Sequence, residues 1–544
     1  MEASGARATA VGGIAGSTEL ARNALGLPQI LFCIVTGSAP LAAMMFNDPL
    51  GGLGFGIAVP AGFWIATVAF TFFSVAYVEM ARRVTTAGGM YSYMSYGFGR
   101  VVGLGTAVGI AAAYMLFAVG VNGVTTYFAQ TGVLHFSGFD MDWRIYAFCF
   151  IALMFFISYF HVESVAKFLG FCLIGELVIL MIFAFAVVVR GGGPDGIIWE
   201  ALNPAAIFSG GEGVAGAERV FGASAAGVGF FACFWSWVGF EMAPNYAEEA
   251  RNPKKMMAAA IYISCIGLGV VYVFWSWMLI NAYGYSQDEW VWAVAHQYAI
   301  QGDSPPVAPG AGIPEGDYSS VFFPVANSFA GVGVENLFRA LIITGSFACS
   351  LAFWNTANRY LFAMGREGIL PRVLGRTHAT HKSPFVAATV LLVFCCGVTA
   401  MFALGGAGQG QQEALGIETS NPLVALFQIG TWLPFQGNTL LFSIMALVDL
   451  AIIVYFWRHA RDGFHWFKTL VAPIIGAGGI AFAIYLMQKN RAFITGTGEY
   501  KGWTEAVPYY ALGIFLGGCL LAVIYKYRAR ERYEAVGKFV HEEA

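Results

Sequence analysis

The sequence predicts an all-α integral membrane protein with about twelve transmembrane helices. Hydrophobic residues make up 58% of the 544-residue chain and charged residues only 11%, whereas charged residues are about a quarter of a soluble domain. Apolar runs long enough to cross a bilayer, about 20 residues each, recur along the chain. A soluble protein is therefore excluded, and because no long basic block occurs, so is a nucleic-acid-binding one.

The apolar runs also divide the chain into parts. The candidate spans are 27–50, 57–80, 100–131, 144–162, 166–190, 217–248, 256–283, 334–364, 384–405, 425–457, 466–487 and 508–527. The first five spans fall in 27–190, the next five in 217–457 and the last two in 466–527. We expect the polar segments 1–26 and 528–544 to lie outside the membrane.

One predicted span and one connecting loop are unusually long. The tenth span is overlong and contains Pro434, so we expect a short dipping segment before the true span. The connection 284–333 is far longer than most loops, and such loops are often functional lids. It is expected to contain a short amphipathic lid helix at 286–299 and a flexible Pro/Gly-rich piece at 304–316.

Basic residues predict the orientation in the membrane, because they concentrate in cytoplasmic loops. An even number of spans places both chain ends on one side. The basic residues expected on that side include Arg82, Arg83, Arg100, Arg251, Lys254, Lys255, Arg366, Arg372, Arg376, Arg458, Arg461, Arg528, Arg530 and Arg532. The opposite loops are acidic or neutral. The chain is therefore expected to span the cell (cytoplasmic or inner) membrane many times, with the N- and C-termini in the cytoplasm.

Two of the predicted helices are interrupted near the middle of the membrane. In the first span, Pro40 lacks an N–H group and disfavours a helical conformation at Ala39, while Gly37 is a poor helix former. In the sixth span, Gly239 and Pro244 weaken the helix. One break could be a simple kink that neighbouring helices repair. A matching pair, one near the start of each five-span half, indicates a transporter built as a five-plus-five inverted repeat.

The dipoles of the broken helices predict the kind of solute. Free N–H groups near Gly37 to Leu41 favour an anion such as a carboxylate. Free carbonyl groups near Thr36 and near Trp235 to Trp237 suit an ammonium group. A zwitterionic α-amino acid supplies both charges.

Four motifs give the chain its resemblance to a known family. They are Thr36-Gly37-Ser38-Ala39, Tyr77 to Arg83 followed by Ala87 to Tyr93, Trp235 to Glu241 followed by Ala247 to Pro253, and Arg359 to Pro371. In this order, over roughly residues 20–460, the chain resembles the amino acid–polyamine–organocation (APC) transporter superfamily. The resemblance implies a LeuT-like fold, with two further C-terminal helices after the inverted repeat.

The resemblance also implies roles for individual residues. Gly37, Ser38 and Ala39 match the helix-1 loop that holds the substrate carboxylate, and Trp235 matches an aromatic residue that closes over the substrate. The stretch Ser236, Trp237, Val238 and Gly239 matches the unwound part of helix 6, whose carbonyl groups take the amino group. The chain departs from the commoner Gly-Ser-Gly loop by having Ala39-Pro40 instead, and Pro40 removes one carboxylate donor.

Charged residues inside the spans are candidates for coupling and gating. Glu176 lies nine residues after Lys167, about 14 Å along a helix and so near the midplane. It is expected to carry the coupling proton or to form a structural hydrogen bond. Glu241 is expected either to gate and sense pH or to cap the second half of helix 6. Ser346 and Ser350 are weaker candidates for a sodium site, since back-bonding within the helix is the ordinary state of such serines.

These observations together predict a permease that carries an amino acid or a related small zwitterion by alternating access, with proton coupling favoured over sodium. An amine or polyamine carrier, an exchanger and a transporter-like nutrient receptor remain alternatives. An enzyme is not expected, since the sequence contains no HExxH, GxSxG or phosphate-loop motif. The nine Cys are scattered and show no ligand spacing, so no metal and no cofactor is expected.

Overall fold

The computed structural model describes residues 23–84, 88–160, 162–208, 226–284, 290, 293–294, 297, 317, 319–378, 380–404, 422–494 and 506–537. All regular secondary structure in these residues is helical, which confirms the predicted all-α class. Most of the segment 1–26, the predicted flexible piece 304–316 and the end of the tail lie outside the described residues.

The helices follow the predicted spans. Their bounds are α1 Leu27–Ser38, α2 Pro40–Ala42, η1 Ala43–Asn47, α3 Asp48–Phe55, α4 Val59–Arg83, α5 Met90–Phe98, α6 Arg100–Ser137, α7 Trp143–Ser158, α8 Val162–Val189, α9 Ala205–Phe208, α11 Ala226–Trp235, η4 Phe240–Glu249, α12 Pro253–Tyr283, α14 Phe322–Ala330, α15 Val332–Arg366, α16 Phe385–Leu404, α18 Pro422–Arg458, α19 Ala472–Lys489, α20 Arg491–Ile494, α21 Val507–Arg528 and α22 Arg530–Ala535.

Ten helical runs of the described residues are long and apolar enough to cross a membrane. One of them, Leu27–Arg83, is 57 residues long and contains both the first and the second predicted spans. The apolar helix Trp143–Ser158 is shorter and covers most of the fourth predicted span. The described residues of every predicted span are therefore mostly helical, apart from Ala39, the stretch 236–239 and a few residues at the ends of spans.

The predicted interruption of the tenth span is wrong. Helix α18 runs through Pro434 as one helix of 37 residues. The proline ring lies against α6 at Gly120, where an added Cβ atom would be 2.5 Å from the Pro434 Cδ atom. Since a glycine on the neighbouring helix leaves room for the ring, α18 continues past the proline.

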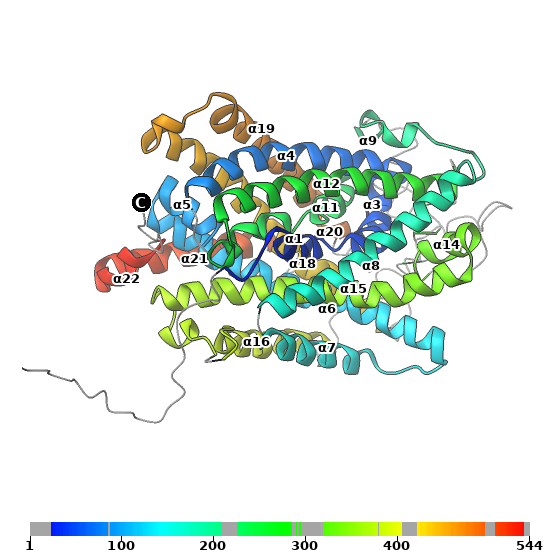
Figure 1. Ribbon diagram of the computed structural model, residues 1–544, viewed down its shortest axis with the longest axis horizontal. Coiled ribbons are helices and arrows are strands. Elements are labelled where there is room, and N and C mark those ends of the chain that lie inside the picture. Colours follow the sequence, from blue (N-terminus) through cyan, green and yellow to red (C-terminus); the bar gives the residue numbers. More distant parts are fainter. Residues whose placement is uncertain are drawn as a thin grey trace, which may run out of the picture.

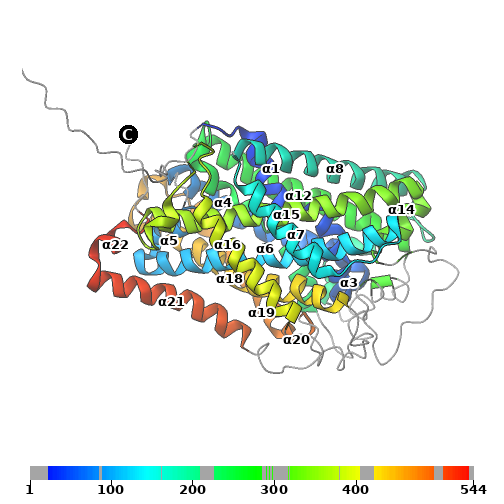
Figure 2. The same cartoon turned by 90° about the horizontal axis from the view of Figure 1, so that it is seen from below.

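The long helices lie side by side along one axis of the molecule (Figures 1 and 2). Helix α6 packs against α15 and α18, α4 packs against α12, and α1 packs against α8 and α15. The C-terminal part of α1 is buried in the bundle, at Cys33, Ile34, Thr36, Gly37 and Ser38. We call the end of the bundle that carries α5, α22 and the C-terminal ends of α4, α15 and α21 the termini face.

The tail is attached to the termini face. The Glu367 carboxylate, just after α15, accepts a hydrogen bond of 2.5 Å from the Tyr91 hydroxyl on α5. Burial raises the pKa of Glu367 to about 7, while hydrogen bonds from Tyr91 and from the Gly537 backbone N–H oppose this rise. The Tyr525 hydroxyl of α21 bonds to the Ile369 carbonyl at 2.7 Å. The last helix and the tail are thus fixed to the end of α15.

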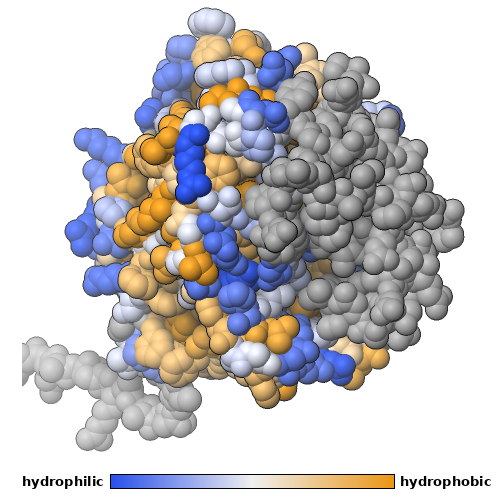
Figure 3. All heavy atoms as spheres, turned by 90° about the vertical axis from the view of Figure 1, so that its right-hand side faces the viewer, coloured by the Kyte–Doolittle hydropathy of each residue, from blue (hydrophilic) through white to orange (hydrophobic). Residues whose placement is uncertain are grey.

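The opposite end shows hydrophilic and hydrophobic side chains intermixed on its visible face (Figure 3). Of the predicted lid helix 286–299, the structure describes Trp290, Ala293, Val294 and Gln297, and all four are helical and buried. The Gln297 amide donates to the Met45 carbonyl at 2.7 Å. These residues therefore cover the end of the broken first span.

Large apolar side chains are exposed along the outer helices, as expected of a surface in contact with lipid. Phe171 and Val189 on α8 are 80% and 83% exposed, and Leu404 on α16 is 83% exposed. Water would not stabilise such a surface, whereas lipid chains do.

Candidate transport site

The first span breaks at Ala39, as predicted. Helix α1 ends at Ser38, and α2 begins at Pro40. Ala39 between them has a left-handed backbone, with φ 40° and ψ 75°, a conformation that costs a residue with a side chain about 1–2 kcal/mol. Pro40 favours this break because it has no N–H group and disfavours the helical conformation at the residue before it.

The sixth span breaks opposite the first. Helix α11 ends at Trp235, and η4 begins at Phe240. Gly239 between them has φ 139°, and an added Cβ atom would lie 2.6 Å from both the Ile34 carbonyl oxygen and the Ser38 nitrogen. Only glycine fits there. The two breaks are therefore in direct contact.

A small cavity lies beside the two breaks. Its lining consists of Gly37, Ser38, Ala39, Ala42, Ala43, Phe46, Asn47, Val121, Val124, Trp235, Cys349 and Phe353. None of these described residues is charged. The cavity is therefore an apolar chamber with the polar backbone of the helix-1 break in its wall.

Four of the predicted substrate-binding residues line this cavity, namely Gly37, Ser38, Ala39 and Trp235. The Trp235 ring is stacked on Phe231 with ring centroids 5.4 Å apart. It meets Phe46 edge-on at 6.1 Å. Trp235 and Phe46 thus form one apolar wall, and the predicted role of Trp235 as a gate stays a prediction.

The other five predicted residues, all within the described chain, lie outside the lining. The Thr36 hydroxyl donates to the Leu169 carbonyl at 3.3 Å. The Trp237 indole donates to the Cys265 carbonyl at 3.2 Å. The Ser236 hydroxyl donates to the Ala232 carbonyl at 2.9 Å. Val238 and Gly239 are buried in the break itself. Any contact of these five residues with a solute stays a prediction.

Sequence reasoning missed most of the lining. Ala42, Ala43, Phe46 and Asn47 follow the break at helical spacing and share one face, which is a signal that could have found them. Val121 and Val124 on α6, and Cys349 and Phe353 on α15, come from helices whose rotation no local pattern sets. Among them, Phe46, Val121, Val124 and Phe353 give the cavity its apolar character.

The carbonyl groups freed at the breaks have partners in this structure. The Tyr272 hydroxyl donates to the Ser38 carbonyl at 2.8 Å and contacts the Ser236 carbonyl at 3.2 Å. The Cys349 thiol contacts the Gly37 carbonyl at 3.1 Å. Tyr272 thus connects the two breaks.

Glu176 caps the second half of the first span. One carboxylate oxygen accepts a hydrogen bond of 3.0 Å from the Leu41 N–H group, the first N–H after Pro40. The side chain is fully buried, and the other oxygen has no hydrogen-bond partner among the described residues. A negative group at a helix N-terminus is favourable. Glu176 therefore occupies one of the donors that the sequence predicted for the solute.

Glu241 caps the second half of the sixth span in a similar way. Its carboxylate accepts a hydrogen bond of 2.8 Å from the Gly239 N–H and a short one from the Tyr114 hydroxyl. Its own carbonyl accepts from the Tyr77 hydroxyl at 2.9 Å. The structure thus shows the helix-cap contact that the sequence left open, and the gating role stays a prediction.

The two candidate sodium ligands are both engaged by carbonyl groups. The Ser346 hydroxyl donates to the Ile342 carbonyl at 2.6 Å, and the Ser350 hydroxyl donates to the Ala118 carbonyl at 2.7 Å. Within the part of the chain that the structure describes, no group of three or more His, Cys, Asp or Glu could hold a metal ion. A sodium role for the serines stays a prediction.

Comparison with known proteins agrees with this geometry. A family model described as amino acid permease matches residues 28–517. A branched-chain amino acid permease of Bacillus subtilis (strain 168) is 22% identical over 466 residues, which are 82% of this chain and 83% of the relative. A low-affinity putrescine importer of Escherichia coli (strain K12) is 23% identical over 68% of this chain and 73% of its own length.

Solved structures show the same fold. A manganese transporter of Eremococcus coleocola superposes with a TM-score of 0.54 at 11% identity and covers 94% of each chain. At such low identity the likeness concerns the fold, which is that of LeuT-type transporters. With the family match, which extends over most of the sequence, the chain belongs to the amino acid permease family of the APC superfamily and is a multi-pass membrane transporter.

Proposed function

We propose that this protein is a secondary active transporter of a neutral α-amino acid with an apolar side chain, driven by protons through alternating access. The observation that carries the proposal is the contact between two broken helices beside a cavity. Broken helices at membrane depth occur where they line a solute site, and their ends supply opposite partial charges. A zwitterion matches that arrangement.

The lining favours an apolar side chain on the solute. Phe46, Val121, Val124, Trp235 and Phe353 surround the cavity and would contact such a group. A diamine, the solute in the name of the Escherichia coli relative, carries two positive charges and would require a carboxylate in the wall. The described lining contains none, so we favour the amino acid over the amine.

Competition between two carboxylates couples solute and proton. The Leu41 N–H group donates a hydrogen bond to Glu176. The carboxylate of the solute requires the same helix N-terminus. Protonation neutralises Glu176 and makes it a weaker acceptor, so the donor becomes available to the solute. The solute and one proton therefore bind together and leave together, which is symport.

The orientation follows the positive-inside rule, so we assign the termini face to the cytoplasm. The helices of the two broken spans, with α4 and α12, would rock against the remaining helices. Near that face, Arg359 pairs with Glu249, and Arg366 pairs with Glu248 at 2.7 Å. These pairs close the inner path in the proposed cycle.

Uptake into proteoliposomes tests the proposal. Radiolabelled L-leucine is expected to accumulate when the lumen is more alkaline than the outside, and Glu176→Gln is expected to abolish that accumulation while retaining binding. Glu163→Gln is the matched control, because Glu163 lies on the same helix but is 49% exposed and pairs with Lys167. This control is expected to accumulate leucine normally.

Two outcomes would contradict the proposal. If Glu176→Gln accumulates leucine normally in a proton gradient, the coupling carboxylate is wrong. If the wild-type protein binds leucine but never accumulates it under any gradient, the protein is a receptor. The assay therefore separates the carrier from the transporter-like receptor.

A further inference from the structure

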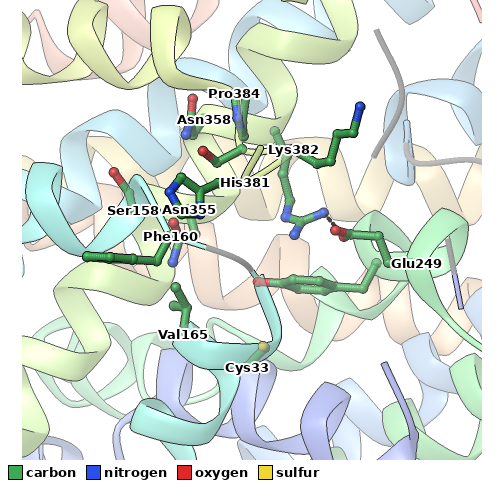
Figure 4. Close-up of a pocket in the computed structure, with 13 residues that line it drawn as sticks. Cys33, Ser158, Phe160, Val165, Glu249, Asn355, Asn358, His381, Lys382 and Pro384 are labelled. Atoms are coloured by element: carbon green, nitrogen blue, oxygen red, sulfur yellow. Dashed lines mark hydrogen bonds and ion pairs between the residues drawn. The ribbon is translucent and has the colours of Figure 1, made fainter. Parts of the chain in front are cut away.

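A second cavity lies between the central site and the termini face. Its lining includes Cys33 of α1, Glu249 of η4, Asn358 and Arg359 of α15, and Lys382 of the loop before α16. In Figure 4, Cys33 and Asn358 lie on opposite sides of the cavity, and Glu249 lies at its edge. We call it the inner cavity.

The inner cavity continues the path from the central cavity. Cys33 precedes Gly37 of the central lining by one turn of α1, a rise of about 6 Å. On α15, Asn358 likewise follows Phe353 of the central lining. The same two helices, α1 and α15, therefore line both cavities.

The wall of the inner cavity contains a buried ion pair. Arg359 pairs with Glu249, and the two side chains are only 10% and 3% exposed. The Arg359 guanidinium also lies over the Tyr246 ring, 4.3 Å from its centroid. Separating two such ions without a replacement leaves each charge buried and unpaired, which is strongly unfavourable.

One acceptor in the wall has no partner. Asn358 is 2% exposed, and its side-chain oxygen forms no hydrogen bond with any described residue. Buried polar atoms are nearly always hydrogen-bonded in folded proteins. The natural partner for this carbonyl oxygen is a donor that enters the cavity, and an ammonium group supplies one.

We propose that the inner cavity is a second binding site for the transported zwitterion. The carboxylate of the solute engages Arg359, and its ammonium group engages Glu249 and the free oxygen of Asn358. This inference rests on the proposed transport of an amino acid. The solute on its way out replaces each partner of the ion pair with its own opposite charge, so the pair opens without leaving a charge unpaired.

This site makes the inner path selective. An uncharged solute or a simple amine replaces at most one partner, and the other ion then stays buried without a counter-charge. A zwitterion replaces both. The empty protein keeps the pair closed, so the inner path opens mainly for the solute that the central cavity has admitted.

Equilibrium binding of radiolabelled L-leucine to the purified, full-length protein tests the inference. Wild type is expected to bind two leucines per chain, the second at least about tenfold more weakly. Asn358→Leu, which keeps the side-chain size but removes the acceptor, is expected to bind one leucine at the high-affinity site. Asn438→Leu is the control, because Asn438 is another fully buried asparagine without hydrogen-bond partners, on α18 and outside both linings. It is expected to bind two.

Native thiols assign each bound leucine to a cavity. Cys349 lines the central cavity and Cys33 lines the inner one, so single-cysteine proteins report each occupancy through protection from a maleimide. Leucine is expected to protect Cys349 at low concentration and Cys33 only at higher concentration, and Asn358→Leu removes the second protection alone.

Binding of only one leucine per wild-type chain would overturn the inner site and leave the proposed function intact. Binding of two leucines by Asn358→Leu, with Cys33 still protected, would have the same consequence. Complete absence of leucine binding in wild type would overturn both.

Discussion

Pro40 and Pro434 both lie within membrane-spanning stretches of this protein, with opposite results. At Pro40 the first span splits, and Ala39 adopts a left-handed backbone. At Pro434 the helix α18 continues without interruption. Both prolines remove a backbone donor, so the difference arises from their surroundings and not from the residue itself.

The surroundings of Pro40 offer partners for the groups that the break releases. Glu176 accepts from the Leu41 N–H, and Tyr272 donates to the Ser38 carbonyl. Around Pro434, the Gly120 position of α6 receives the ring. A proline therefore breaks a membrane helix where other side chains bind the released groups, and is accommodated where a neighbouring helix provides space.

The largest effect is expected at the point where the two broken spans touch. Gly239→Ala places a Cβ atom 2.6 Å from the Ile34 carbonyl oxygen on a backbone with φ 139°. We expect a loss of about 3 kcal/mol or more in unfolding free energy and no measurable leucine transport. The measurements are thermal unfolding in detergent and uptake into proteoliposomes.

The control for this change is Gly267→Ala on α12, where an added Cβ atom meets nothing within 4 Å. It is expected to keep transport and to stabilise the helix by up to about 1 kcal/mol. Equal effects of the two alanines would show that the contact between the breaks is unimportant.

The next largest effect is expected when Pro40 and Pro434 are each replaced by alanine. Pro40→Ala lets Ala39 return to a right-handed helix and recover about 1–2 kcal/mol, so the first span straightens and transport falls about tenfold or more. Pro434→Ala removes a ring from an already continuous helix, and transport is expected to stay within about twofold of wild type. Uptake rates of the two variants, corrected for protein amount, are the measurement. A larger loss from Pro434→Ala than from Pro40→Ala would refute the comparison.

The sequence was sufficient to predict features that depend on a residue's own backbone. The breaks at Ala39 and Gly239 follow from Pro40, Gly37 and glycine geometry, and the spans follow from apolar length. It could not predict which side chains face the cavity. Successive helical residues point about 100° apart, so Gly37 lines the cavity while Thr36 points to Leu169.

The remaining site residues come from helices far away in the chain. Phe353 and Cys349 reach the cavity through the rotation of α15, and Tyr272 reaches both breaks from α12. These helices are apolar on nearly all sides, so their sequence does not indicate which face is inward. The error at Pro434 has the same origin, since only the position of Gly120 on another helix decides whether the proline ring fits.

Glu241 and Glu176, whose carboxylates cap the second halves of the broken spans, differ in the hydrogen bonds that they accept. Both oxygens of Glu241 accept a hydrogen bond, from Gly239 and Tyr114, whereas one oxygen of Glu176 has no partner among the described residues. A proton added to Glu241 would disrupt existing bonds, while Glu176 has a free oxygen to receive it. Glu176 is therefore the carboxylate expected to exchange its proton when the solute arrives.

Calorimetric titration of the purified protein with L-leucine, in two buffers that differ in ionisation enthalpy, measures that proton directly. At a pH where the empty protein holds Glu176 ionised, we predict that binding takes up close to one proton in wild type and none in Glu176→Gln, with leucine affinity largely retained. Proton uptake of the same size in both proteins, or none in wild type at any pH where it binds leucine, would contradict the competition between Glu176 and the solute for the Leu41 N–H group.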